Sequence, residues 1–559
     1  MPDRDTQATT GDTGDTATDV DAVVIGAGFS GLYMLHRLRE LGLDVRVYEK
    51  GDAVGGTWYW NRYPGARCDS ESHIYCYSFS EELQKEWEWT ERYPEQPEIL
   101  EYLQWVADRL DLRRDIQFET EVTSATWDED TGRWTVETAD GETVTTQFFI
   151  TAVGCLSKPY KPDFEGLEEY EGEWYHTARW PEGEMDFSDT HVGVIGTGST
   201  GIQFISEVGG RAEQLTVFQR TPNYAVPARN RPLTDEEYGE IRENYDDIWA
   251  RARDSRLGMP FEWEQNNAWG MSDEEVREVL EERWQQGGFR FLHAFEPGYI
   301  LSNEEINETI SEFLREKIRE QVDDPETAEK LVPTDHPYGA KRPPMDYDGY
   351  YETYNRDDVT LVDVNEHPIE RFTPEGIQTA ADHYDLDVVV FATGFDAMTG
   401  AILALDIEGR DGLTLAEKWA DGPRTYLGLG THGFPNLFTI TGPQSPSVLT
   451  NMPMSIEQHV EWITDCIAFM REEGHDTIEA SEHSETQWVQ NTNMLAENML
   501  FSRAASWYRG ANVPGKTRIF TPFPGGLDNY REICERVAGD DYDGFEFDRV
   551  ADAPTVADD

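Results

Sequence analysis

The chain has 559 residues, too many for one hydrophobic core, and its 110 Asp and Glu against 46 Lys and Arg give a formal net charge of −64. Nucleic acids and anionic membranes would repel so acidic a protein, which excludes both as expected partners. The five cysteines are Cys68, Cys76, Cys155, Cys466 and Cys534. They show neither Cys-x-x-Cys spacing nor a secreted disulfide framework, so we expect no metal site and a reducing compartment, the cytoplasm.

The acidity also predicts a salty environment. Self-repulsion on this scale would strain a compact fold in dilute buffer, whereas molar salt screens it, because the Debye length falls to ~3 Å at 1 M. Only nine of the 46 basic residues are lysines. This bias resembles the proteins of salt-accumulating microbes, and we interpret it as adaptation of a halophile to a saline cytoplasm.

The N-terminal 20 residues have neither a basic segment nor an apolar segment of the kind that a signal peptide contains. Their polar composition predicts a disordered tail. No apolar run in the chain approaches the roughly 20 residues that a membrane span needs.

The first predicted fold unit, residues 21–50, reads as strand, glycine turn, helix and second strand. Its turn is Gly26-x-Gly28-x-x-Gly31, in which the glycines permit a tight turn, let the backbone approach a pyrophosphate, and allow close packing of helix on strand. Glu49 ends the second strand, where a carboxylate can accept hydrogen bonds from ribose hydroxyls. The unit therefore predicts a dinucleotide site.

A second copy of this unit has the glycines Gly196, Gly198 and Gly201, and its second strand ends at Arg220 and Thr221. An acidic residue would repel a ribose 2′-phosphate, whereas a guanidinium can bind it through charge-assisted hydrogen bonds. The first site therefore suits FAD and the second suits NADPH.

Between the two copies, residues 133–149 alternate apolar and polar side chains around Asp140 and Gly141, which predicts a β-hairpin.

Beyond Arg229 the sequence becomes acidic with helical spacing up to about Pro333. Two of these segments open with the pattern of a capping box, Ser272 with Glu275 and Ser302 with Glu305. We expect a helical insertion here.

The predicted fold class is α/β, with two Rossmann-like dinucleotide-binding domains and a helical insertion in the NADPH domain. The predicted boundaries are a tail at 1–20, an FAD domain at 21–157 and 390–545, an NADPH domain at 158–228 and 334–389, the insertion at 229–333 and a flexible tail at 546–559.

Two dinucleotide sites in one chain indicate that a nicotinamide reduces a flavin by hydride transfer. A disulfide reductase would then need a redox-active cysteine pair, and the cysteine spacing offers none. An oxygenase would need a site that stabilises a flavin peroxide.

Two further motifs carry a family resemblance. The segment YEGEWYHTARWP resembles the fingerprint Phe-x-Gly-x-x-x-His-x-x-x-Trp-Pro of the Baeyer-Villiger monooxygenases. It supplies Tyr170 in place of Phe, with Gly172, His176, Trp180 and Pro181 in register.

The second motif, GGTWYWNRYPGARCD, matches another signature of the same family and ends at Asp69. The resemblance covers residues 21–530 or so. It identifies the chain as similar to class B flavoprotein monooxygenases of the phenylacetone and cyclohexanone monooxygenase kind.

This resemblance implies residue roles. Arg342 would stabilise the flavin C4a-peroxide anion and Asp69 would pair with it, which fits a guanidinium as a permanent positive charge. The FAD contacts implied are Gly26, Gly28, Ser30, Gly31, Glu49, Gly56, Thr57, Trp58, Asp69, Tyr75, Val122 and Met452. The implied NADP contacts are Arg67, Cys68, Gly196, Thr197, Gly198, Ser199, Thr200, Gly201, Gln203, Arg220, Thr221, Lys341 and Trp507.

The implied function is an FAD- and NADPH-dependent monooxygenase that inserts one oxygen atom of O₂ beside a ketone carbonyl to give an ester or lactone. A flavin monooxygenase that oxidises nitrogen or sulfur uses the same cofactors and stays open as an alternative. So does a flavoprotein that binds NADPH and FAD as a redox sensor without turnover. The sequence does not reveal the ketone or the oligomeric state, and a monomer is compatible with it.

His176 invites two interpretations. It could act as an acid or base, or it could tie the linker between the domains to the nucleotide domain. Its position, before the second glycine motif and remote in sequence from Arg342 and Asp69, favours the linker role.

Overall fold

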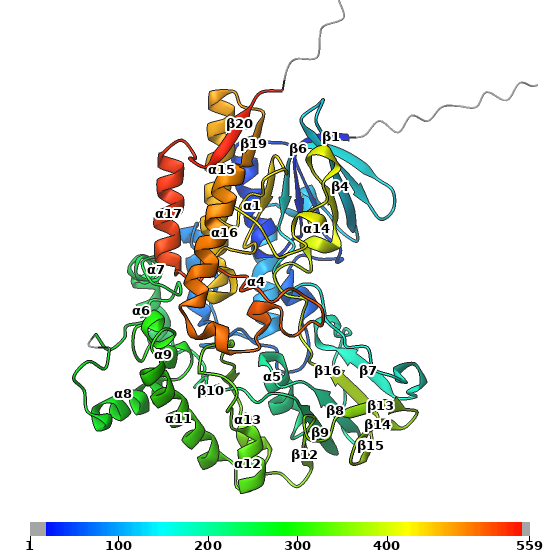
Figure 1. The fold of residues 1–559 in the computed structure, drawn as a ribbon, viewed down its shortest axis with the longest axis vertical. Helices are drawn as coiled ribbons and strands as arrows, with labels where there is room; N and C mark the ends of the chain where they lie inside the picture. Colours follow the sequence, from blue (N-terminus) through cyan, green and yellow to red (C-terminus); the bar gives the residue numbers. More distant parts are fainter. Residues whose placement is uncertain (1–17, 266, 551–559) are drawn as a thin grey trace, which may run out of the picture.

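The computed structural model describes residues 18–265 and 267–550, so most of the two predicted tails lies outside the described residues. Figure 1 shows three regions: a large sheet with long helices, a second sheet below it, and a group of helices beside the second sheet. The predicted α/β class with two dinucleotide-binding domains is confirmed.

The first sheet has eight strands in the order β17-β4-β5-β6-β1-β2-β3, with β18 also on β6. Its central strand β1 (Thr18–Ile25) is parallel to β2 (Val45–Tyr48) and to β6 (Thr143–Thr151). Because β1 begins at Thr18, the predicted tail at 1–20 was too long by three residues. The other strands are β3 (Ile116–Gln117), β4 (Val122–Asp128), β5 (Arg133–Thr138), β17 (Asp406–Glu408) and β18 (Leu437–Thr439).

The predicted hairpin around Asp140 and Gly141 is confirmed, because β5 and β6 pair antiparallel on either side of it.

Helices cover this sheet. The first, α1 (Phe29–Glu40), follows the glycine turn after β1 and is buried along most of its length, and α15 (Met452–Glu473) lies beside it. The further helices are α2 (Thr57–Trp60), α3 (Glu81–Glu86), α4 (Gln96–Arg109), α14 (Leu415–Lys418), α16 (Glu482–Glu497) and α17 (Leu527–Gly539). A ribbon of β19 (Thr477–Ala480) and β20 (Phe545–Asp548) closes the C-terminus, so the ordered chain passes the predicted end at 545.

The second sheet is entirely parallel, in the order β12-β9-β8-β16-β7. Its strands are β7 (Glu173–His176), β8 (His191–Ile195), β9 (Gln214–Gln219), β12 (Val359–Asp363) and β16 (Val388–Phe391). The predicted boundary at 389 falls inside β16, since an apolar strand that continues into FATGF gives no signal of a change of domain. Helices α5 (Ser199–Val208) and α13 (Tyr350–Thr353) and the small sheet of β13 (Ile369–Thr373), β14 (Gly376–Thr379) and β15 (His383–Asp385) flank it.

The predicted helical insertion contains α6 (Asp235–Glu243), α7 (Tyr245–Arg253), α8 (Asp273–Gln286), α9 (Phe289–Leu292), α10 (Pro297–Ile300), α11 (Glu304–Gln321) and α12 (Pro325–Leu331). Two short strands at its base, β10 (Val226–Pro227) and β11 (Met345–Asp346), pair with each other.

One of the two predicted capping boxes is confirmed. Ser272 accepts from the Glu275 backbone at the start of α8, and Glu275 accepts from the Ser272 backbone. The predicted box at Ser302 was wrong, because Asn303 is the N-cap of α11. The Asn303 side-chain oxygen accepts hydrogen bonds from the N–H groups of Glu305 and Ile306. The Ser302 hydroxyl donates backwards to the preceding turn instead.

The chain crosses between the two sheets twice, after β6 and after β16, and the two crossings run side by side. The Tyr160 N–H donates to the Gly394 carbonyl at 2.9 Å, and the Asp396 N–H donates to the Lys158 carbonyl at 2.9 Å. These bonds join the crossings into a two-stranded hinge ribbon.

No helix in the described part of the chain is both long and apolar enough to span a bilayer.

A buried carboxyl ties α15 to the first sheet region. Glu457 accepts hydrogen bonds from the Ser78 N–H at 2.5 Å and the Phe79 N–H at 3.3 Å. Burial raises the pKa of Glu457 to about 7, and the Ser78 hydrogen bonds oppose that rise.

We therefore predict a pH-dependent stability difference between the protein and its Glu457→Gln variant. Between about pH 4.5 and 7 the folded state holds a proton that the unfolded state has lost, so the free energy of unfolding falls as pH rises and is level above pH 7. The variant has an amide that does not titrate at this position, so its free energy of unfolding does not fall for this reason as pH rises. Its Tm relative to the parent should therefore rise by a few degrees between pH 5 and 8, measured by thermal unfolding in molar NaCl. A difference in Tm that stays constant with pH would contradict the assignment.

Candidate active site

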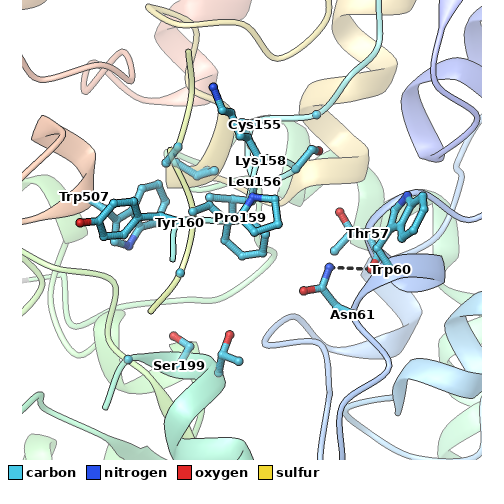
Figure 2. Close-up of a pocket in the computed structure, with 18 of the residues that line it drawn as sticks. Thr57, Trp60, Asn61, Cys155, Leu156, Lys158, Pro159, Tyr160, Ser199 and Trp507 are labelled. Atoms are coloured by element: carbon cyan, nitrogen blue, oxygen red, sulfur yellow. Dashed lines mark hydrogen bonds between the residues drawn. The ribbon is translucent and has the colours of Figure 1, made fainter. Parts of the chain in front are cut away.

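A cavity of about 1300 Å³ lies between the two sheets. This volume exceeds the roughly 300–1,000 Å³ of a pocket for one small ligand. In Figure 2, Thr57 and Trp507 lie on opposite sides of it, with Ser199 on the second sheet's helix α5. Of the predicted residues, the lining includes Gly26, Gly28, Ser30, Glu49, Gly56, Thr57, Trp58, Asp69, Tyr75, Val122 and Met452, and also Arg67, Cys68, Gly196, Thr197, Gly198, Ser199, Thr200, Gln203, Arg220, Thr221, Lys341, Arg342 and Trp507.

Gly31 and Gly201 are the predicted cofactor-binding glycines that do not line the cavity. A Cβ on Gly31 would lie 1.8 Å from the Gly26 carbonyl oxygen, and one on Gly201 would lie 2.2 Å from that of Gly196. Any side chain at either position would collide with the glycine turn, so only glycine lets the helix pack on that turn. This is the packing role that the motif predicts for its third glycine.

Both glycine turns leave a helix N-terminus open toward the cavity. The N-cap residues of α1 and α5 are Gly28 and Gly198, and neither helix has a side-chain cap. A Cβ on Gly198 would meet no atom within 4 Å. Free N–H groups at a helix N-terminus, with open space above them, suit the pyrophosphate of a dinucleotide.

Glu49 lies at the cavity edge directly after β2 and is buried. It accepts from the Ala27 N–H at 2.8 Å and from the Gly51 N–H at 2.7 Å. Burial raises the pKa of Glu49, and these backbone bonds and the charge of Arg179 oppose that rise. Its carboxyl is thus held in place where a ribose would lie if the pyrophosphate rests on α1.

The corresponding place in the second unit is basic. Arg220 and Thr221 follow β9, and Lys341 lines the same cavity close enough to feel the charge of Arg220. Burial lowers the pKa of Lys341, Asp335 at 3.8 Å opposes this, and Arg220 adds to it. Two cations held near each other suit a dianionic phosphate.

Arg342 is the centre of the polar contacts deep in the cavity. Its Nε and Nη2 donate to Asp69 Oδ2 at 2.9 and 2.6 Å, and its Nη1 donates to the Val448 carbonyl at 2.7 Å. Its guanidinium carbon lies 4.7 Å from the centre of the Phe289 ring. Burial opposes the charge of Arg342, but Asp69 and the Tyr508 hydroxyl raise its pKa above the usual value, so the guanidinium is permanently charged.

A second, smaller cavity of about 50 Å³ also reaches Arg342. Its walls are mostly apolar and come from the insertion, from the loop before α15 and from the C-terminal segment. They include Leu257, Met259, Phe289, Leu292, Leu301, Leu449, Met499, Phe501, Tyr508 and Phe523. Arg342 therefore lies between the large cavity and the small apolar one.

Arg67 and Cys68 line the large cavity, but their groups are already engaged. The Arg67 guanidinium donates to Glu91 at 2.5 Å and is also paired with Glu95. Burial keeps the pKa of the Cys68 thiol well above its usual value. Gln203 of α5 donates to the Arg67 carbonyl at 3.1 Å, which ties this loop to the second domain.

None of the predicted fingerprint residues, Tyr170, Gly172, His176, Trp180 and Pro181, lines either cavity.

His176 lies instead on the hinge ribbon. Its Nε2 is 3.2 Å from the Tyr160 carbonyl oxygen and 3.4 Å from the Thr393 hydroxyl. Its Nδ1 accepts from the Ala178 N–H at 3.1 Å. Burial lowers the pKa of His176, which makes it a neutral hydrogen-bonding group directly behind Tyr160 and Thr393, two residues that line the large cavity.

The sequence reasoning missed Arg179, which lies inside the fingerprint and does line the large cavity. Its guanidinium lies 4.3 Å from the centre of the Trp60 ring, in the first domain. It also missed the contacts that hold the segment of Trp507 in place. Lys516 donates to Asp396 at 2.5 Å, and Asn512 donates to the Phe395 carbonyl at 2.7 Å.

Among the described residues, no group of three or more His, Cys, Asp or Glu side chains could hold a metal ion.

Comparison with known proteins agrees with this site. The family described as flavin-binding monooxygenase-like matches residues 20–231. A Baeyer-Villiger monooxygenase of Pseudooceanicola batsensis is 45% identical over 96% of this chain and 97% of its own length. An acetone monooxygenase (methyl acetate-forming) of a Gordonia species is 45% identical over 95% and 99%. A phenazine N-monooxygenase of Lysobacter antibioticus is 44% identical over 94% and 97%.

Among solved structures, cyclohexanone monooxygenase from Rhodococcus sp. Phi1 bound to NADP⁺ superposes with a TM-score of 0.93. It is 46% identical and covers 96% of this chain and 100% of its own. Identity of this degree over nearly the full length of both chains shows that this protein belongs to the Baeyer-Villiger monooxygenase family.

Proposed function

We propose that this protein uses FAD, NADPH and O₂ to insert one oxygen atom next to the carbonyl of a ketone, which gives an ester or a lactone. The observation that carries the proposal is the position of Arg342, held by Asp69 where the large cavity meets the small apolar one. A buried, permanently charged guanidinium can stabilise negative charge on oxygen in both cavities.

The first glycine turn, the N-terminus of α1 and Glu49 would hold FAD. Its pyrophosphate would rest on the free N–H groups beside Gly28, and its ribose on the Glu49 carboxylate. When bound, the flavin accepts hydride from NADPH and activates O₂.

The second glycine turn and α5 would hold NADPH. Gly198 leaves room for its pyrophosphate, and Arg220, Thr221 and Lys341 would contact the 2′-phosphate. Trp507 would contact this coenzyme from the segment that Lys516 holds on the hinge ribbon.

Arg342 would orient the ketone through its oxygen and stabilise the negative charge that develops there. Asp69 keeps the guanidinium aimed at that point, since two of its three nitrogens donate to one carboxylate oxygen. The apolar walls of the small cavity would exclude water from the reacting carbonyl.

The small cavity supports a compact aliphatic ketone that would lie beside Arg342 with only part of its carbon skeleton in this cavity, because about 50 Å³ is far below the volume of a pocket for a whole ligand. Most of the walls of the small cavity are large apolar side chains. A bulky aryl ketone would have to displace one of them.

We also propose that the fingerprint histidine, His176, acts through the hinge. It contacts both crossings between the domains, at Tyr160 and Thr393, so it can hold the ribbon while the domains shift.

Oxidation of an aromatic nitrogen is the second candidate, because a relative at 44% identity is a phenazine N-monooxygenase. The same two cofactors would serve it. Product analysis on ketones and on a phenazine separates the two reactions.

The described cysteines are all free and buried, which supports a reducing compartment such as the cytoplasm as the place of action.

The first test is Arg342→Ala. We expect ester formation to fall on the order of 10²–10³-fold because a preorganised charge is lost, while anaerobic bleaching of the flavin by NADPH continues. Arg410→Ala is the control, since Arg410 also pairs with carboxylates but lines neither cavity. Ester formation near the parent rate in Arg342→Ala would remove the basis of the proposal.

The second test is Arg220→Ala, which should raise the KM for NADPH about tenfold or more, because a charge-assisted hydrogen bond contributes about 1.5–3 kcal/mol. The KM for NADH, which has no 2′-phosphate, and the FAD content should stay at the parent values. An unchanged KM for NADPH would reject the phosphate assignment.

The third test compares acetone, cyclohexanone and phenylacetone. The parent should prefer the first two by kcat/KM, and Leu301→Ala, which removes a wall of the small cavity, should shift the preference toward phenylacetone. Leu415→Ala shortens a buried leucine of the first domain outside both cavities and serves as the control. The same ketone preference in all three proteins would show that the small cavity is not the ketone site.

A further inference from the structure

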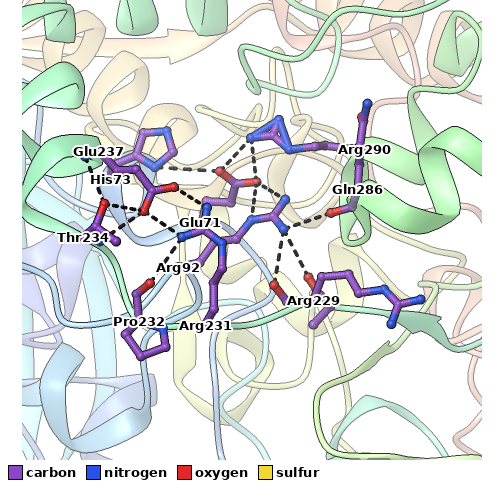
Figure 3. A network of polar contacts seen from close by, with 11 residues as sticks. Glu71, His73, Arg92, Arg229, Arg231, Pro232, Thr234, Glu237, Gln286 and Arg290 are labelled. Atoms are coloured by element: carbon purple, nitrogen blue, oxygen red, sulfur yellow. Dashed lines mark hydrogen bonds and ion pairs between the residues drawn. The ribbon is translucent and has the colours of Figure 1, made fainter.

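Two residues beyond Asp69, a second carboxylate is buried in a network of arginines (Figure 3). Glu71 is only 3% exposed. Its Oε1 accepts from Arg92 Nε and Nη2 at 3.1 and 2.8 Å, and its Oε2 accepts from Arg290 Nη2 at 3.0 Å. Burial disfavours its charge, but Arg290, His73 and Arg92 lower the pKa of Glu71, so the carboxylate stays ionised.

This network joins two parts of the molecule that are far apart in sequence. Glu71 and Arg92 belong to the first domain, whereas Arg290 lies on α9 of the insertion. Arg92 also donates to the carbonyl of Gln286, the last residue of α8. The loop that carries Asp69 is thus bonded directly to the insertion.

The residue before Arg290 is Phe289, whose ring faces the Arg342 guanidinium at 4.7 Å. The contacts therefore form a closed ring: Arg342 to Asp69, along the loop to Glu71, across the ion pair to Arg290, to its neighbour Phe289, and back to Arg342. Phe289 is buried and lines the small apolar cavity.

The start of α9 is also restrained from the other side. Gly287 and Gly288 precede it with φ of 70° and 61°, a conformation that favours glycine. A Cβ on Gly288 would lie 1.8 Å from the Tyr93 hydroxyl oxygen. With this turn fixed at one end, the ion pair to Glu71 sets the direction in which α9 presents Phe289.

We propose that the Glu71–Arg290 ion pair is a positioning element for the reaction, which holds Phe289 against the Arg342 guanidinium and thereby sets one wall of the ketone cavity. The inference rests on the proposed function for its meaning in catalysis. It concerns Glu71 and Arg290, which line neither cavity and act through Asp69 and Phe289.

Arg290→Met removes the charge of this half-buried side chain, which also stacks on the Phe261 ring at 4.2 Å, and keeps an apolar stem of similar length to pack there. Arg290→Met should raise the KM for cyclohexanone on the order of tenfold and lower the ester formed per NADPH consumed, since small misplacements at a reacting centre cost up to about 10²-fold. Arg290→Lys, which has a stem of similar length and keeps the charge, should restore most of both values.

A second measurement does not depend on turnover. The unreactive lactam δ-valerolactam has the size of cyclohexanone, and its dissociation constant can be measured by ligand-observed NMR on the holoenzyme. Arg290→Met should weaken its binding about as much as it raises the KM, and Arg290→Lys should not. In a Phe289→Leu background, Arg290→Met should have less than about a twofold effect, because residues that act through one contact are not additive.

Glu485→Gln is the matched control. Glu485 is fully buried and pairs with Lys418 at 3.0 Å and Arg424 at 3.1 Å, but it lines neither cavity. It should lower the Tm without changing lactam binding.

The proposal is overturned if Arg290→Met binds the lactam within twofold of the parent, or if Glu485→Gln weakens it equally. It is also overturned if Arg290→Met keeps its full effect in the Phe289→Leu background. A parent that binds the lactam but makes no ester from any ketone would refute the proposed function and leave the lactam measurements to decide the role of the ion pair.

Discussion

The structure depends on one buried charge, the guanidinium of Arg342. Its side chain is 19% exposed, and a charge removed from water to this degree costs several kcal/mol unless it is paired and hydrogen-bonded. Asp69, the Val448 carbonyl and the Phe289 ring supply these contacts from three separate parts of the chain. The first domain therefore contributes Asp69 and Val448 to this residue, and the insertion contributes Phe289.

The two crossings between the sheets run side by side. They are bonded to each other as a ribbon, with His176 on one side and Asp396 on the other. Asp396 also binds Lys516 of the segment that carries Trp507. The crossings between the domains are thereby bonded to the segment whose Trp507 lines the large cavity.

The local predictions that succeeded rest on short-range chemistry. Glycine turns, the Asp140 hairpin and the Ser272 capping box each follow from residues within a few positions of one another. The wrong predictions concern places where two neighbouring residues could form the same cap, or where no turn residue marks the end of a strand. Asn303 replaced Ser302 as the N-cap because both can accept, and β16 continues to Phe391 because its apolar run has no break.

The sequence alone predicted the two dinucleotide units, their opposite charges at Glu49 and Arg220, and the family. These predictions were possible because a strand, its glycine turn and the following helix are formed by consecutive residues. The tertiary structure decided what surrounds Arg342. Asp69 and Arg342 are 273 residues apart, and only the family resemblance predicted the pair that the structure shows. Glu71 and Arg290 are 219 residues apart, and nothing in the sequence predicted their pair. These ion pairs depend on burial. Water solvates each charge in the extended chain, and the charge needs a partner only after the fold has excluded water.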